Sequence, residues 1–226
     1  VQLEAIWRDL GEDFFLRHTT QEIVTISQEL LVHSIEREPF VAISEPHTDS
    51  VEEGATKIYV LDRDRSKTFA AIVVTLNQLG LTVVDAYINK ASGDRYFDMF
   101  TVLDSKGSEV IDLGARENII KRVKENLVDP EPATSGTGQR VPRQLKELKI
   151  PASVTLVAEP HDHAAILNIT ASDRPGFLAT IALVLVEVGL EIMSARITTL
   201  GERVEDVFEV VSKKGESMHN GQKRYE

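Results

Sequence analysis

An internal duplication constrains the fold of this chain more than any other feature of its sequence. Residues 64–91 align without gaps on residues 173–200 with nine identities in 28 positions, and residues 93–107 align on residues 201–215 with seven in 15. The shared positions are mostly apolar residues and glycines, which a repeated unit keeps for its core, helix ends and turns. The sequence therefore predicts two copies of one structural unit.

The first copy reads as alternating strands and helices. Apolar segments predict strands over 57–64, 80–91, 93–107 and 152–160, and longer segments predict helices over 66–79 and 111–129. This order, βαββαβ, predicts the α+β class with tandem ferredoxin-like units. The first domain is assigned to 56–128 plus 152–159 and the second to 164–226. The second copy is expected to be truncated, because residues 216–226 are too few for the helix and strand that close the first copy.

Two further segments surround the first copy. Residues 1–55 are predicted to form a helical connector, in which Thr19 and Glu22 have capping-box spacing before a helix over 20–33. Between residues 36 and 55 we expect one strand and a loop. Residues 129–151 hold four of the eight prolines and are predicted to be a linker without one regular element.

Composition narrows the function classes. A formal net charge of -11 argues against nucleic acid or an anionic membrane as the main partner, because both attract clustered lysine and arginine. The absence of cysteine excludes disulfides, thiolate nucleophiles and cysteine zinc sites, and it fits the cytoplasm as the expected location. No apolar run has the length of a transmembrane helix.

The second copy contains the strongest candidate for a binding site. An acidic turn with proline and glycine precedes an apolar helix predicted over 175–188, and the first helical turn offers N–H groups that attract a carboxylate. Glycine removes the side chain that would keep a ligand away from the backbone. The candidate ligand-binding residues are Asp173, Arg174, Pro175, Gly176, Phe177 and Leu178. In the alternative interpretation, Asp173 only caps its own helix and Gly176 only permits tight packing.

The first copy departs from this pattern. Its corresponding residues are Asp64, Arg65, Ser66 and Lys67, so proline and glycine are replaced by serine and lysine. We expect a weaker site there or none, because the lysine side chain obstructs approach to the backbone. Asp206 and Arg203 repeat as Asp98 and Arg95 and are interpreted as pairs across a hairpin.

Two other features have competing interpretations. The second helix carries more apolar residues than one sheet can bury, with Val184 and Val186 left over. The excess indicates contact either with another unit or with a further domain. His161, Asp162 and His163 lack a third ligand at a recognised spacing, so a polar turn is favoured over a metal site.

The duplicated unit with "DRPGFLATIALVLVEVGLEIMSARI" resembles the ACT domain, a ferredoxin-like module that usually senses amino acids. Three further segments are "WRDLGEDFFLRHTTQEI", "PRQLKELKIPASVTLV" and "TTLGERVEDVFEVV". Together they resemble the C-terminal region of the bacterial bifunctional uridylyltransferase/uridylyl-removing enzymes. This resemblance covers essentially the whole chain.

The resemblance implies a regulatory region that responds to L-glutamine or another small amino acid. In that family, nucleotidyltransferase and HD hydrolase domains precede the ACT pair and modify the PII nitrogen-regulatory protein. The implied partners are therefore the enzyme's own catalytic domains, the PII protein and, as a homodimer, a second copy. Mg²⁺ is expected only for the catalytic domains, so this chain is expected to have no catalytic residues, metal or cofactor. The alternative is an ACT pair that serves only dimerisation or interdomain docking, without ligand.

Overall fold

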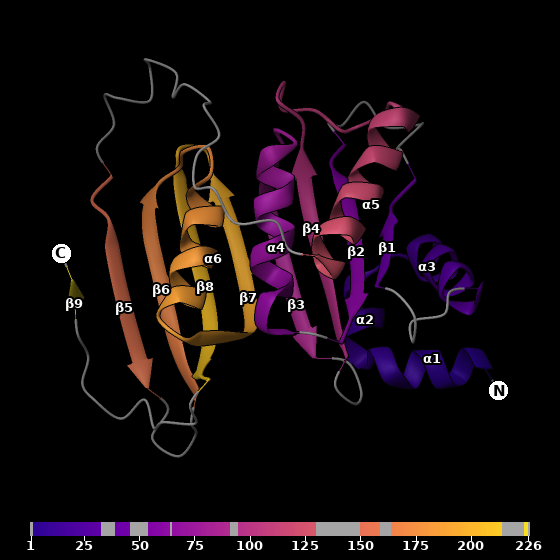
Figure 1. Ribbon diagram of the computed structural model, residues 1–226, viewed down its shortest axis with the longest axis horizontal. Coiled ribbons are helices and arrows are strands. Elements are labelled where there is room, and N and C mark those ends of the chain that lie inside the picture. Colours follow the sequence, from indigo (N-terminus) through magenta and orange to yellow (C-terminus); the bar gives the residue numbers. More distant parts are fainter. Residues whose placement is uncertain are drawn as a thin grey trace.

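A computed structural model describes residues 2–32, 39–45, 54–63, 65–90, 95–129, 150–158, 164–213 and 224–225. These residues form one antiparallel sheet with helices on both of its faces (Figure 1). The strands are β1 (Phe40–Ile43), β2 (Thr56–Asp62), β3 (Thr82–Lys90), β4 (Tyr96–Leu103), β5 (Ser153–Ala158), β6 (Ala164–Ser172), β7 (Leu190–Leu200), β8 (Arg203–Ser212) and β9 (Arg224–Tyr225). Their order across the sheet is β1-β2-β4-β3-β7-β8-β6-β5-β9. The predicted α+β class with ferredoxin-like units is confirmed.

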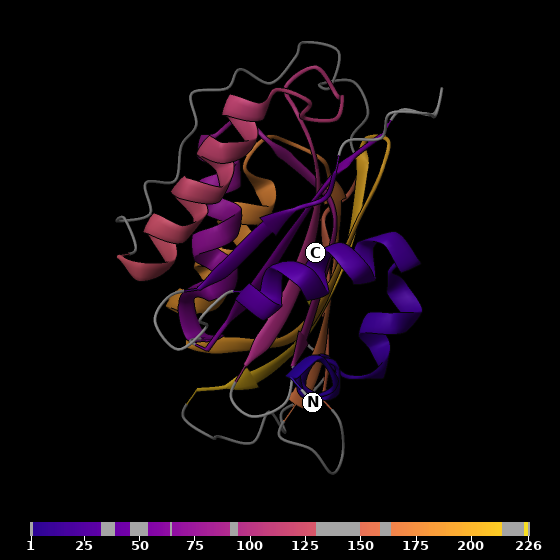
Figure 2. The ribbon, with the colours of Figure 1, turned by 90° about the vertical axis from the view of Figure 1, so that its right-hand side faces the viewer.

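The helices are divided between the two faces of the sheet. They are α1 (Gln2–Leu10), α2 (Glu12–Arg17), α3 (Thr20–Val32), α4 (Arg65–Gln78), α5 (Leu113–Val128) and α6 (Phe177–Glu187). Figure 2 shows α4, α5 and α6 on one face and the three N-terminal helices on the other. No helix in the described part of the chain is long and apolar enough to cross a membrane.

The duplication is visible in the sheet. The order β2-β4-β3 in the first copy is repeated as β6-β8-β7 in the second, and α4 and α6 are the corresponding helices. The copies join where β3 pairs with β7, from Asp85 opposite Thr198 to Ile88 opposite Ala195. We call this pairing the junction.

The edge strand of each copy differs from the prediction. Strand β1 from the connector pairs with β2, whereas β5 pairs with β6 of the second copy. Residues 152–159 were assigned to the first domain, and the structure corrects this assignment. The first unit is therefore β1-β2-α4-β3-β4-α5 and the second is β5-β6-α6-β7-β8. The reason is that every strand offers the same backbone hydrogen-bonding groups. An apolar pattern therefore predicts a strand, but it does not predict which open sheet edge that strand pairs with.

This correction also changes the expected truncation. The second unit has its edge strand, because β5 supplies it from the N-terminal side. What it lacks, among the residues that the structure describes, is a counterpart of α5.

The predicted connector helix is confirmed as α3, and its capping box forms. Thr19 N donates to Glu22 Oε2 at 2.8 Å, and Glu22 N donates to Thr19 Oγ1 at 3.3 Å. Lys57 Nζ and Tyr59 Oη on β2 donate to Glu22 Oε1 at 2.6 and 3.0 Å. Burial raises the pKa of Glu22, but hydrogen bonds led by that from Lys57 outweigh it and hold the pKa at about 2. This carboxylate therefore joins the connector to the first unit.

Candidate functional site

The predicted ligand-binding residues of the second unit lie at the N-terminal end of α6, beside the first unit. They line a cavity of about 210 Å³. Its wall combines Val73, Asn77, Leu81, Thr82 and Val83 of the first unit with Asp173, Arg174, Pro175, Gly176, Phe177, Leu178 and Ala179 of the second. The site is thus built by both units, although its role in ligand binding stays a prediction.

The proline and glycine form a turn ahead of the helix. Phe177 N donates to the carbonyl oxygen of Arg174 at 3.0 Å, and Gly176 has φ 77° and ψ 5°. Proline followed by glycine with positive φ is the arrangement of a type II turn. Helix α6 consequently begins at Phe177, two residues later than predicted.

Gly176 lies beside Asn77 of the first unit. A Cβ atom at this position would lie 3.4 Å from Asn77 Nδ2 and 3.5 Å from Asn77 Oδ1, which is ordinary van der Waals contact. The glycine is therefore required by its positive φ, not by lack of space.

The start of α6 carries no side-chain cap. Gly176 is its N-cap residue, and no described side chain accepts a hydrogen bond from the first helical turn. The interpretation of Asp173 as a cap is therefore wrong; its own N–H donates to the carbonyl oxygen of Glu202 at 2.8 Å. An uncapped N-terminus is suited to a carboxylate of a bound molecule.

Asp173 lines the cavity, and its charge acts on a second carboxyl group, that of Asp206. Burial raises the pKa of Asp173, while the N–H of Arg174 lowers it in part. Asp206 on β8 is 1% exposed, and burial and the charge of Asp173 raise its pKa to about 7 against the effect of the Thr198 N–H. The expected pairing of Asp206 with Arg203 is wrong in this unit, because Arg203 Nε contacts Glu205 Oε1 at 2.7 Å.

Sequence reasoning missed the residues that the first unit contributes. Asn77 aligns with Val186 of the second copy, so the duplication gave no indication of its role. Its one available signal was a polar amide near the C-terminal end of α4. The expected second contact of α6 is α4, which lies beside it (Figure 1). Val184 and Val186 nevertheless remain 48% and 37% exposed, and Val188 is 61% exposed.

The weaker site predicted in the first unit has a different backbone. Helix α4 begins at Arg65, directly after Asp64, so Ser66 and Lys67 are helical. Asp64 and the side chains of the next three residues lie outside the described part of the structure. Binding there stays untested.

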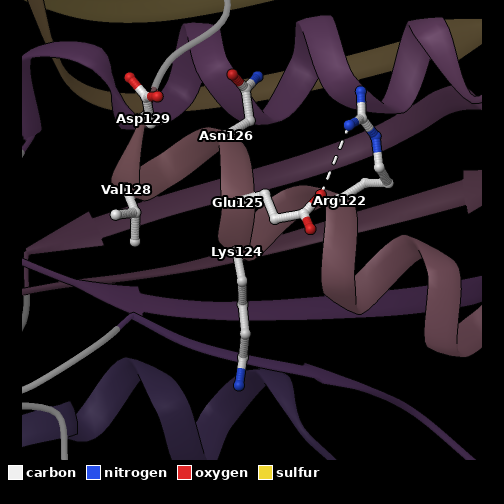
Figure 3. Close-up of a pocket in the computed structure, with 6 residues that line it drawn as sticks. All are labelled: Arg122, Lys124, Glu125, Asn126, Val128 and Asp129. Atoms are coloured by element: carbon white, nitrogen blue, oxygen red, sulfur yellow. Dashed lines mark ion pairs between the residues drawn. The ribbon is translucent and has the colours of Figure 1, made fainter.

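Other candidate positions add little. The triplet His161, Asp162 and His163 lies outside the described residues, and the described ones contain no group of three potential metal ligands. A second hollow of about 520 Å³ is lined, among the described residues, by the C-terminal end of α5 and the residue that follows it: Arg122, Lys124, Glu125, Asn126, Val128 and Asp129 (Figure 3). One segment supplies all of this described lining, so the described residues give the hollow no opposing wall.

The connector contacts the junction on the face opposite to the helices that flank the cavity. The Arg17 guanidinium at the end of α2 lies 3.8 Å from the centre of the Tyr87 ring on β3. Burial raises the pKa of Asp85 on the same strand, and the charges of Arg196 and Arg17 lower it in part. Residues of the connector and of both units therefore meet at this point.

Comparison with known proteins identifies the homologues. The chain is 37% identical over 209 residues to the bifunctional uridylyltransferase/uridylyl-removing enzyme of Ectopseudomonas mendocina (strain ymp), and 37% identical over 210 residues to that of Pseudomonas putida (strain W619). The enzyme of Azotobacter vinelandii (strain DJ / ATCC BAA-1303) is also 37% identical, over 209 residues. Each match covers 91% of this chain but spans only 23% of the relative's length. No family model matches the chain.

Proposed function

We propose that this chain is the amino-acid-sensing regulatory region of a bifunctional uridylyltransferase/uridylyl-removing enzyme, with L-glutamine as its ligand. The observation that carries the proposal is the cavity between the two units, which an uncapped helix N-terminus enters from one side and Asn77 from the other. The homology to such enzymes supports the assignment to this type of protein.

The chemistry of the cavity suits a small amino acid. The N–H groups of the first turn of α6 favour the α-carboxylate. The amide of Asn77 offers both a donor and an acceptor, as does the side-chain amide of glutamine. Val73, Leu81 and Val83 provide apolar surface for the methylene groups between them.

The proposed mechanism is a population shift. A ligand that contacts α4 and α6 at once binds better to one packing of the two helices than to another, and this difference in affinity biases the packing. Because both units share the junction, a change in their packing reaches Tyr87 and Arg17 on the opposite face. The connector then alters how the region covers the catalytic domains.

The remaining parts of the proposal concern the whole enzyme. The catalytic domains with their Mg²⁺, and the PII protein on which they act, belong to polypeptide beyond this chain. The chain itself supplies no catalytic residue. We place the enzyme in the cytoplasm, without nucleic acid or membrane as partners.

Calorimetric titration of the chain with L-glutamine tests the proposal, with L-glutamate and L-serine as controls. We expect saturable binding that favours glutamine and that is lost in Gly176→Val. Gly189→Val is the matched control, because Gly189 also has a positive φ of 75° but ends α6 away from the cavity. Asn77→Leu should weaken binding without backbone strain. No heat with any amino acid would reject the proposal.

A second function is favoured by the exposed valines on α6. Val184 and Val188 form an apolar flank that a docking or dimerisation module would bury. Sedimentation at several concentrations, with and without L-glutamine, separates the two functions. Self-association that is independent of ligand, together with no binding heat, would support docking alone.

A further inference from the structure

The connector exposes an unusual share of the large apolar side chains of the molecule. Thirteen large apolar residues are exposed in the described part of the chain, and five of them lie within residues 15–32. These five are Phe15, Leu16, Val24, Leu31 and Val32, with exposed fractions of 38%, 81%, 44%, 40% and 89%. Single exposed apolar residues are normal, whereas a concentration of them in one short segment marks a contact surface.

Trp7 on α1 links the exposed residues of α2 and α3. Its ring lies edge-on to the ring of Phe15, with 5.6 Å between the ring centres. Its indole N–H donates to Ser27 Oγ on α3 at 2.9 Å. Val24 and Leu31 lie three residues before and four residues after Ser27, so both are its neighbours on the surface of that helix. Trp7, Phe15, Val24 and Leu31 therefore form one surface across three helices, which we call the connector patch.

The helices that carry the connector patch are already fixed by a core of their own. Leu10, Phe14, Ile26 and Leu30 are 2–3% exposed and pack with buried residues of β1, β2 and β4. Figure 2 shows the three helices on the face of the sheet opposite to α4, α5 and α6. The patch is thus preformed, and a preformed surface loses little conformational entropy when a partner binds.

The composition of the connector patch fits a protein partner. Aromatic residues are enriched at protein–protein interfaces, and tryptophan is enriched among the residues that contribute most of the binding energy. The net charge of -11 opposes association with a second copy of the chain. The matches to the homologous enzymes span only 23% of their length, so most of such an enzyme is polypeptide outside this region. That polypeptide is the partner that the length and the charge favour.

We infer that the connector patch is the docking surface for the catalytic domains of the enzyme. This inference rests on the proposed function, because that function places the chain in a longer polypeptide. It also gives α2 a role in regulation. Arg17, at the end of α2, lies 3.8 Å from the centre of the Tyr87 ring at the junction, and Phe15 of the same helix belongs to the patch. A change in the packing of the two units therefore reaches docked domains through this short helix.

Cysteine labelling measures whether the patch is covered, because the chain contains no cysteine of its own. Val24→Cys is introduced into this chain alone and into the full-length enzyme, and mass spectrometry follows the reaction of that peptide with a maleimide. We expect labelling to be about tenfold slower in the full-length enzyme, because only the undocked fraction reacts. Val207→Cys is the matched control, since Val207 on β8 is similarly exposed, at 38%. It should react at the same rate in both proteins.

Leu31→Glu provides a second test on the same surface. A charge placed in an apolar interface is costly, so this change should restore fast labelling of Val24→Cys in the full-length enzyme. Val207→Glu, the control, should not. Leu31 is 40% exposed, so its replacement leaves the core of the connector intact.

Three results would overturn the inference. The first is equal labelling of Val24→Cys in the chain and in the full-length enzyme. The second is an equally large slowing of Val207→Cys. The third is self-association of the chain in sedimentation that Leu31→Glu abolishes, which would assign the patch to a second copy. All of these measurements are made without L-glutamine, so a failure of glutamine binding would reject the proposed ligand and leave the docking result unchanged.

Discussion

The two units have the same strand order but different surroundings. In the first unit, α4 and α5 cover one face and the connector helices cover the other, where Phe14, Tyr59 and Phe97 are buried. In the second unit, α6 is the one helix that the structure describes on the sheet. The aligned positions Thr75 and Val184 are 1% and 48% exposed. Duplication therefore preserved the sheet, while neighbouring elements decided how much of each copy is buried.

The turns before the two helices differ in a way that affects function. Helix α4 begins directly after Asp64, whereas a type II turn delays α6 until Phe177. The later start leaves room for the cavity beside Asn77. The first unit thus supplies a wall of the site and the second supplies the uncapped helix.

The largest expected effect comes from removing one large buried side chain from the core of each unit in turn. Phe100 and Phe208 are aligned and 0% exposed, so replacing either with alanine should lower the free energy of unfolding by about 3–5 kcal/mol. Denaturant unfolding measures the loss. Because the sheet is continuous, we expect a single transition in both variants. Two separate transitions would show that the units unfold independently.

Asp206→Asn should stabilise the second unit at pH 8. Its folded pKa of about 7 lies above the ordinary 3.8, so its contribution is full below pH 3.8 and is lost as the pH rises through 7. Removing the charge should raise the free energy of unfolding by about 2–4 kcal/mol at pH 8, and by less at pH 5. Thermal denaturation across this range measures the difference. A loss of stability at pH 8 would contradict the prediction.

Exchanging the aligned residues Thr75 and Val184 tests whether α4 is covered by neighbouring elements and α6 is not. Asn126 Nδ2 on α5 donates to Thr75 Oγ1 at 2.7 Å, so Thr75→Val should cost about 1–2 kcal/mol. Val184→Thr, the reverse change on the exposed flank of α6, should alter the free energy of unfolding by less than about 0.5 kcal/mol. Chemical denaturation of both variants provides the comparison. An equal loss in the free energy of unfolding for both variants would mean that Val184 is also buried in solution.

The smallest effect concerns the connector and has the opposite pH dependence. Burial lowers the pKa of His18, although the Phe14 carbonyl raises it in part, and Nε2 has no hydrogen-bond partner among the described residues. Its contribution is therefore full above pH 6.5 and is lost as the pH falls towards the lowered value. We therefore expect the free energy of unfolding to fall between pH 7 and pH 5. Thermal denaturation should show that His18→Gln reduces this loss; an unchanged pH profile would exclude His18 as its source.

Much of the fold was predictable because its signals are local. The periodicity of apolar residues indicated the repeated helices and strands, and Thr19 with Glu22 indicated the start of α3. The turn at Pro175 and Gly176 was also visible, although its type and the later start of α6 were not. Local patterns report conformation because they act through each residue's own backbone preferences and nearest neighbours.

Two features of the site depended on contacts between distant segments. The positions of β1 and β5 could not be predicted, because an unpaired sheet edge accepts any suitable strand that the linkers allow to reach it. Asn77 was missed because its neighbour Gly176 is about a hundred residues away along the chain and belongs to the other unit.

The sequence by itself determined the duplication, the fold class and the helix N-terminus that is suited to an anion. Only the tertiary structure decided which strand completes each unit, which residue faces Gly176 and which carboxyl group is coupled electrostatically to Asp173. The physical reason is that backbone preference and apolar periodicity are properties of short segments. Edge pairing, burial and electrostatic coupling arise only when separate segments share the same space.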